Sequence, residues 1–192
     1  MGIKKMMRCV EPVPGGVPRT RFGGQPDWIG PPQWPLSRQL QEPMRFIGQV
    51  ALADAFPGHE GKMAYLFMTE DDDQYVDGTW EPEGGENAVV IQPGGEPVPS
   101  AQALASGPSR AGFDVEIVEF EVEAGDLEGS RIGGEPEFLQ GEEYPEPRAE
   151  WRFLCQIDSC SLPFEVNFGD AGIAYVFVDT HAAKGRLLWQ CG

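Results

Sequence analysis

The chain has 192 residues, of which 41% are hydrophobic, and it carries 25 glycines, 18 prolines and a formal net charge of −17. No apolar run reaches the roughly 20 residues that span a bilayer, and this charge excludes anionic membrane surfaces and nucleic acids as natural partners. The glycine and proline content disfavours long helices and favours short strands joined by many turns.

The beginning of the chain differs in charge from the rest. Residues 1–50 contain seven Lys/Arg and three Asp/Glu, whereas residues 51–192 contain seven Lys/Arg and 28 Asp/Glu. The acidic part would attract a cationic protein or peptide, although the same charge also serves solubility alone. Residues 1–16 include two lysines with no apolar stretch after them, which is unlike a secretory signal, so we expect a cytoplasmic protein.

A tight turn followed by two short strands is predicted next. The turn is the Gly-Gly-x-Pro motif at residues 23–26, where glycine allows a backbone path that a Cβ would obstruct, and Trp28 would anchor it on a core. Apolar runs at residues 46–50 and 64–68 predict buried strands. Gln49 lies inside the first of these, so its side chain must find hydrogen-bond partners or face a cleft.

A strand at residues 88–92 completes this first unit, and a linker is predicted after it. Residues 93–112 are rich in Gly, Pro, Ser and Ala and show no hydrophobic period, with one helical turn expected at residues 100–105. Residues 114–123 then alternate apolar and acidic side chains, and a phase slip at Ile117–Val118 predicts a bulge.

After the slip, three glutamates are predicted to share one face of that strand: Glu119, Glu121 and Glu123. Like charges side by side destabilise a sheet unless they are solvated or paired. Two interpretations stay open, a solvated outer face and a docking strip for a basic partner.

The second half of the sequence restates the first. Residues 130–139 match residues 20–29, and the two apolar strand blocks recur at residues 153–157 and 174–178. The offsets are 110, 107 and 110 residues. Three blocks in the same order at nearly one offset predict an internal duplication.

We therefore predict a mainly β (β-rich α+β) fold in one compact domain, residues 1–192. Two pseudo-symmetric β units, residues 18–92 and 113–192, would flank the linker 93–112, with a closing strand at residues 185–190. Their junction would form a polar and aromatic cleft near Trp28, Gln49, Phe138 and Gln156. The residues predicted to shape turns are Gly23, Gly24, Pro26, Gly133, Gly134, Pro136, Gly169 and Gly172.

Catalytic motifs are missing from the sequence. It contains two histidines and no P-loop, dinucleotide fingerprint or G-x-S-x-G motif, so we predict a non-enzyme without a cofactor. The four cysteines are spaced as buried free thiols and not as a metal site, although Cys155 and Cys160 could approach across a turn. Residues 71–73, Asp-Asp-Asp, lack the glycine and distal glutamate of a calcium loop and predict a solvated turn.

Asp158 and Asp170 carry a second hypothesis, a small-ligand receptor or an enzyme. Asp170 lies in a Gly-Asp-Ala-Gly turn that enters an apolar strand. Its carboxylate would either close the turn by accepting backbone N–H bonds or contact a ligand.

A set of motifs in order covers nearly the whole chain: Phe22-Gly23-Gly24-Gln25-Pro26, Trp34-Pro35, residues 43–50, Gln156-Ile157-Asp158, residues 168–172 and Trp189-Gln190-Cys191. This set resembles the bacterial YwqG-like family, whose function is unassigned. The first unit also resembles the eukaryotic programmed-cell-death-2 type proteins, chaperones of a ribosomal protein, but it lacks their Cys-x-x-Cys pairs.

The resemblance implies a duplicated β-rich fold and a protein-binding role, with bacterial relatives suspected of neutralising toxins. Together with the charge, it leads us to expect a non-catalytic acidic module that sequesters or chaperones a basic protein or peptide.

Overall fold

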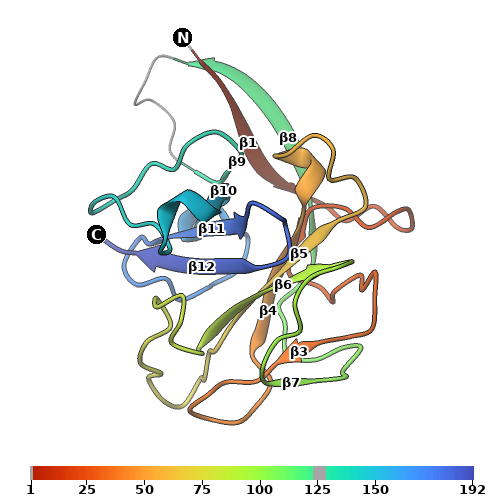
Figure 1. Ribbon diagram of the computed structural model, residues 1–192, viewed down its shortest axis with the longest axis vertical. Helices are drawn as coiled ribbons and strands as arrows, with labels where there is room; N and C mark the ends of the chain where they lie inside the picture. Colours follow the sequence, from red (N-terminus) through yellow and green to blue (C-terminus); the bar gives the residue numbers. More distant parts are fainter. Residues whose placement is uncertain (1, 123–128) are drawn as a thin grey trace.

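A computed structural model describes residues 2–122 and 129–192 (Figure 1). The mainly β fold is confirmed, with short 3-10 helices η1 (Leu52–Asp54), η2 (Arg148–Glu150) and η3 (Ser159–Ser161) between strands. The strands are β1 (Gly2–Val10), β2 (Arg21–Phe22), β3 (Trp34–Pro35), β4 (Arg45–Ala51), β5 (Met63–Met68), β6 (Asn87–Gln92), β7 (Ala101–Gln102), β8 (Phe113–Val122), β9 (Arg131–Ile132), β10 (Trp151–Asp158), β11 (Ile173–Asp179) and β12 (Gly185–Gln190). No helix in the described ranges is long and apolar enough to cross a membrane.

Ten strands form one sheet in the order β12-β11-β10-β9-β1-β8-β2-β4-β5-β6. The long antiparallel pair β1–β8 lies at its centre, and the strands outside that pair follow one another in mirrored order. The sequence did not predict β1, although residues 2–10 pair with β8 along their full length. The predicted bulge at Ile117–Val118 is wrong, because the register from Gly2↔Val122 to Val10↔Asp114 runs without a shift.

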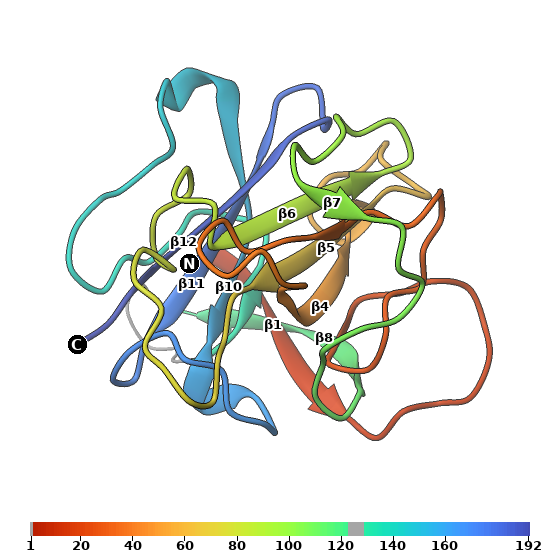
Figure 2. The ribbon, with the colours of Figure 1, turned by 90° about the horizontal axis from the view of Figure 1, so that it is seen from below.

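The sheet curls until its two edge strands, β6 and β12, lie side by side, as both ribbon views show (Figures 1 and 2). The predicted closing strand at residues 185–190 is therefore confirmed as β12. A hydrophobic cluster shared by the two ends of the sheet fills the space between them, with Leu66 and Ile91 from one end and Val176 and Leu187 from the other. The core thus joins both halves into one unit.

Two smaller hydrophobic clusters cover the outer face of the sheet, one over β5 in the first half and one over β11 in the second. Tyr65 and Phe67 of β5 belong to one of them, and Tyr175 and Phe177 of β11 belong to the other. The intervening residues of both strands face the shared core. Burial on both faces explains why these strands are near-continuous apolar runs in the sequence.

Equivalent contacts recur in the two halves. The hydroxyl of Tyr65 accepts a hydrogen bond from the backbone N–H of Ile29, and the hydroxyl of Tyr175 accepts one from that of Leu139, at 3.0 Å in both. Burial raises the pKa of each tyrosine to about 12, so both hydroxyls stay protonated at neutral pH. Duplication itself stays a prediction, and these pairs are the contacts that it requires.

The predicted linker packs against the first half. Within residues 93–112, β7 pairs with β3 in a separate two-stranded sheet, with Trp34 opposite Gln102. The helical turn expected at residues 100–105 is wrong, because Ala101–Gln102 is extended. The aromatic side chain of Trp34 is fully buried beneath this segment.

Candidate functional site

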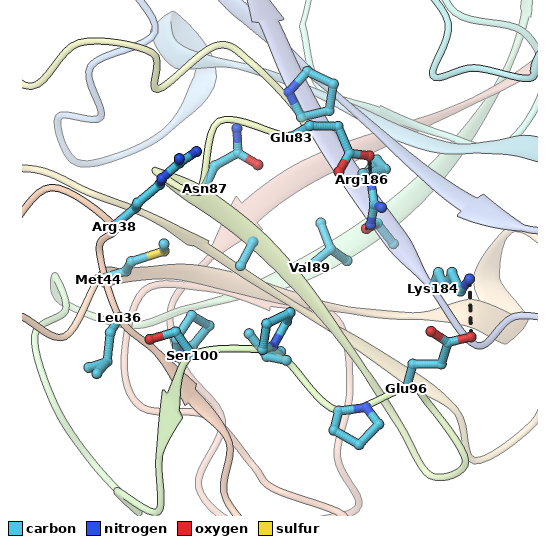
Figure 3. Close-up of a pocket in the computed structure, with 18 of the residues that line it drawn as sticks. Leu36, Arg38, Met44, Glu83, Asn87, Val89, Glu96, Ser100, Lys184 and Arg186 are labelled. Carbon is cyan, nitrogen blue, oxygen red and sulfur yellow. Dashed lines mark hydrogen bonds and ion pairs between the residues drawn. The ribbon is translucent and has the colours of Figure 1, made fainter. Parts of the chain in front are cut away.

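A pocket of about 440 Å³ opens where the edge strands β6 and β12 meet (Figure 3). We call it the seam pocket. Its lining comes from residues 35–44, residues 82–89, residues 96–100 and the turn 183–186. It therefore lies at the junction of the two halves, where a cleft was predicted, but none of the residues predicted for that cleft lines it.

The floor of the seam pocket is apolar and its rim is charged. Arg186 pairs with Glu83, and Lys184 pairs with Glu96 at 3.1 Å. Arg38 faces them from the other side of the mouth (Figure 3) and forms no ion pair within the described part of the chain. Apolar groups beneath include Leu36, Met44, Val89 and the prolines Pro35, Pro82, Pro97 and Pro99. Three cations and two carboxylates leave this rim slightly positive in an otherwise acidic protein.

Side-chain packing, and not a hydrogen-bonded ladder, closes the sheet at this pocket. The edge strands β6 and β12 stand at opposite ends of the strand order. Gly185 lies so close to Val89 that a Cβ on the glycine would fall 2.2 Å from Val89 Cγ1. Both strands consequently have one edge outside the main ladder, which is the usual template for an added strand.

Asp179 holds the turn that carries Lys184 and Gly185 to the pocket. Its carboxylate accepts backbone N–H bonds from Ala183 at 2.6 Å and from Lys184 at 2.7 Å. Burial alone would raise the pKa of Asp179, but these hydrogen bonds, with a further one from His181, lower it. The carboxylate is therefore ionised at neutral pH and stabilises the turn.

The substitution Asp179→Asn is expected to lower the free energy of unfolding by about 1–2 kcal/mol at neutral pH, because an amide oxygen accepts these bonds less strongly. A carboxyl whose folded pKa is lowered contributes stability above its unfolded pKa of about 3.9, and loses it as pH falls through the folded pKa. Urea unfolding of both proteins should show their difference shrinking below that pH. Asp170→Asn, at an exposed side chain, is the matched control, and a pH-independent difference would contradict the argument.

The two glutamines predicted for the cleft are buried within their own halves. Gln49 is fully buried, accepts the N–H of Asp27 at 2.8 Å and donates to the carbonyl of Arg19 at 2.8 Å. Gln156 is 3% exposed and accepts from Nη2 of Arg131 at 2.7 Å. Placing them in one inter-repeat cleft is wrong, because each fastens the turn of its own half.

The two predicted aromatic residues are likewise separated. Trp28 packs on Tyr65 with ring centroids 4.7 Å apart, and Phe138 packs on Tyr175 at 4.8 Å. Each belongs to the outer cluster of its own half. They anchor the two Gly-Gly-x-Pro turns, as the sequence suggested, and do not meet.

The predicted turn glycines adopt the conformation that the motif requires. Gly23 and Gly24 have φ values of 65° and 71°, and Gly133 and Gly134 have values of 69° and 76°. The prolines that complete the two motifs are Pro26 and Pro136. These left-handed values favour glycine, which explains the repeated Gly-Gly pair.

Asp158 and Asp170 do not form a common site. The carboxylate of Asp158 accepts the N–H of Cys160 at 2.8 Å and caps η3. Asp170 is exposed, and in the described residues its side chain accepts no bond from the turn. The turn instead depends on Gly172, where a Cβ would fall 1.7 Å from the carbonyl oxygen of Phe168, and on Gly169 with φ of 76°. Neither aspartate lines the seam pocket.

The predicted acidic strip is exposed on β8 beside a basic neighbour strand. Glu119 stands opposite Lys5 and Glu121 opposite Ile3 in β1, whereas Glu123 lies outside the described residues. The register also places Glu116 opposite a basic residue, Arg8, of β1. Basic residues of β1 therefore offset part of the charge of this strip.

A second, acidic pocket of about 210 Å³ lies between the two halves and was not predicted. Its lining includes Asp71, Asp72 and Tyr75 from the loop after β5, and Glu165 from the second half. At its base Glu70 is held by Arg45 at 2.7 Å, Arg110 at 3.4 Å and the N–H of Asn167 at 3.1 Å. We call this site the acidic pocket.

The cysteines are free thiols in the structure. Cys155 is buried, and burial raises the pKa of its thiol, whereas Cys160 is exposed, so the prediction of a buried thiol is wrong there. Within the described residues no group of three or more His, Cys, Asp or Glu side chains is arranged to hold a metal ion.

Comparison with known protein families gives a match over most of the chain. No curated protein matches the chain. A family model described as a domain of unknown function, DUF1963, matches residues 60–187. This range runs from just before β5 into β12 and makes up most of the chain. The protein therefore belongs to the DUF1963 family.

Proposed function

We propose that this protein is a non-catalytic, cytoplasmic binding module that captures a basic protein or peptide through the acidic pocket. The observation that carries the proposal is the composition of that pocket, where Glu70, Asp71, Asp72 and Glu165 gather at the junction of the halves. Only Glu70 and Asp72 of these carboxylates are paired with arginines in the described residues. Asp71 accepts the backbone N–H groups of Asp73 and Gln74, but neither it nor Glu165 has a cationic partner in the described residues, so a partner can supply one.

An exposed aromatic ring beside these carboxylates supports recognition of arginine or lysine. The side chain of Tyr75 is 75% exposed, which is unusual for a residue of this size. A guanidinium group can stack on such a ring while it pairs with a neighbouring carboxylate. Residues 51–192, with 28 acids against seven basic residues, would steer the partner toward the site.

The resemblance to YwqG-like proteins and to programmed-cell-death-2 type proteins points the same way, because it implies binding of a protein partner. Toxin neutralisation or chaperoning of a basic protein is the form of this function that we propose. The DUF1963 family has no assigned function, so the proposal stands on the acidic pocket and the charge.

A small-ligand receptor is the second candidate, and the seam pocket favours it over the Asp158 and Asp170 region. Its volume of about 440 Å³ falls in the range of ligand sites, and its apolar floor beneath a few charged groups has their usual composition. A thermal-shift survey of apolar carboxylates, which Arg38 could bind, would test this candidate.

Binding of a fluorescent lysine- and arginine-rich peptide tests the first proposal. We expect affinity to fall at least about tenfold between low and physiological salt, because screened charges drive association. Asp71→Asn with Glu165→Gln should weaken binding several-fold. Glu119→Gln with Glu121→Gln removes the same charge from the strip on β8 and is the matched control. Equal losses in both double variants, or binding insensitive to salt, would refute the acidic pocket as the site.

A further inference from the structure

In the first half, an extended segment of the chain covers the Gly-Gly turn. Phe46 donates its backbone N–H to the carbonyl of Pro108 at 2.9 Å, and Gly24 donates to that of Arg110 at 2.8 Å. Ser109 forms a parallel bridge with Phe46. Residues 107–110 thus lie along the turn as an added strand.

Glycine in this segment allows it to lie flat on an aromatic ring. The amide side chain of Gln25 bonds both the N–H and the carbonyl of Gly107, at 2.9 and 3.0 Å. A Cβ on Gly107 would fall 2.9 Å from the ring of Trp34. Four groups therefore receive the segment: two backbone N–H groups, a polar side chain and a ring.

The same four positions recur in the second half, where no segment of the described residues bonds to them as residues 107–110 do in the first. Gly134, Glu135, Tyr144 and Phe153 follow Gly24, Gln25, Trp34 and Phe46 at the offsets of the sequence repeat. All four line one groove of about 600 Å³, which we call the Gly134 groove. Its other lining residues are Phe56, Arg148, Ala149, Trp151 and Arg152.

The two turns differ in how they are covered. A Cβ on Gly24 would fall 3.4 Å from Cα of Gly112, whereas a Cβ on its counterpart Gly134 would meet nothing within 4 Å. The N–H of Gly134 has no hydrogen-bond partner among the residues that the structure describes. Phe153 pairs with Phe177, and the register of β10 shifts directly after it, as the register of β4 shifts directly after Phe46. We therefore expect the N–H of Phe153 to point into the groove, just as the N–H of Phe46 points to Pro108.

We propose that the Gly134 groove binds an extended segment of a partner protein, of the glycine–proline–small-residue type, as an added strand on Gly134 and Phe153. The segment that fills the equivalent position in the first half, Gly-Pro-Ser-Arg at residues 107–110, supplies the template for this chemistry. Recognition is through main-chain hydrogen bonds, so the site goes beyond the salt-dependent capture proposed for the acidic pocket.

One side chain must move for the segment to bind. The guanidinium of Arg148 stacks on Tyr144 at 3.9 Å, over the ring that corresponds to Trp34. Arg148 is exposed, so it can swing into solvent while the glycine of the bound segment takes its place on the ring. Stacking of an exposed arginine on a ring is weak, and the main-chain bonds of a bound segment can offset its loss.

The octapeptide Ala-Ser-Gly-Pro-Ser-Arg-Ala-Gly, identical to residues 105–112, is the probe. Titrated into the full chain in high salt, it should bind saturably and shift the backbone amide NMR signals of Gly134 and Phe153. In Gly134→Asn the new residue tolerates the positive φ, but its side chain occupies the groove. This variant should bind the peptide at least about tenfold more weakly. Gly61→Asn, at φ of 75° with open space around it, is the matched control and should bind like the parent.

Three results would overturn the inference. One is the absence of saturable binding at millimolar peptide, and another is equal binding by both asparagine variants. The third is self-association of the free protein through these amides, which would make the occupant a second copy of this chain. Salt-dependent capture by the acidic pocket is measured separately, so either site can fail alone.

Discussion

Replacing Gln156 by leucine is expected to lower the free energy of unfolding by about 3 kcal/mol. The side-chain oxygen of Gln156 accepts from Nη2 of Arg131 at 2.7 Å and from the N–H of Glu137 at 3.2 Å. Arg131 is only 4% exposed, so leucine would leave a charged N–H buried without its acceptor. Urea denaturation should show a lower midpoint with an unchanged slope.

A second substitution separates this effect from simple loss of packing. Arg131 also pairs with the half-exposed Glu137 at 2.9 Å, so the group left unsatisfied is its Nη2. Removing that buried donor with Arg131→Met should recover about 1 kcal/mol, so the double variant should be more stable than Gln156→Leu alone. Gln102→Leu, at an exposed position of β7, should change stability by less than about 0.5 kcal/mol. Strict additivity of the two substitutions would count against the network.

Adding one methyl group at Gly185 is expected to cost about 2–3 kcal/mol, because the new Cβ would overlap Val89 at the seam between β6 and β12. The backbone of Gly185 is not left-handed, so the cost is steric and not conformational. The same crowding should distort the seam pocket beside it. Calorimetric or urea unfolding of Gly185→Ala measures the loss.

Making room at the partner residue should reverse that loss. Val89→Ala alone truncates a largely buried side chain and should lower the free energy of unfolding by about 1 kcal/mol. Combined with Gly185→Ala, however, it should make the double variant more stable than Gly185→Ala alone. A double variant less stable than Gly185→Ala would show that the two strands are not in the contact described.

The sequence predicted the long strands that have a hydrophobic pattern of their own, and it missed the two-residue strands and β1, which its neighbours define. Residues 63–68 and 173–179 are buried on both faces, and burial on both faces leaves an apolar run that can be recognised locally. Residues 2–10 contain three basic residues and show no such run. They become a strand because β8 and β9 pair with them on either side, and pairing partners distant in sequence leave no local signal.

The candidate site was less predictable for a similar reason. A glutamine inside an apolar strand can either face a cleft or bond to buried backbone. Gln49 bonds to backbone because the turn that contains Asp27 lies beside it, which the sequence does not show. The seam pocket exists because the curvature of the sheet brings β6 and β12 together, and curvature accumulates over many strands. The sequence predicted a turn at Gly134, but not that it is uncovered, because only the contacts of residues 107–110 on the first turn reveal the difference.

The central position of β1 also determines the order in which the molecule can fold. Its partner β8 begins more than one hundred residues later, and β9 follows later still. A chain emerging from the ribosome must therefore expose residues 2–10 until most of the sequence has been synthesised. Closing so long a loop carries an entropic cost that is paid before any of the central pairing forms, so folding should be slow and governed by long-range contacts. During that wait the first half offers an unpaired sheet edge, the kind of surface that chaperones protect.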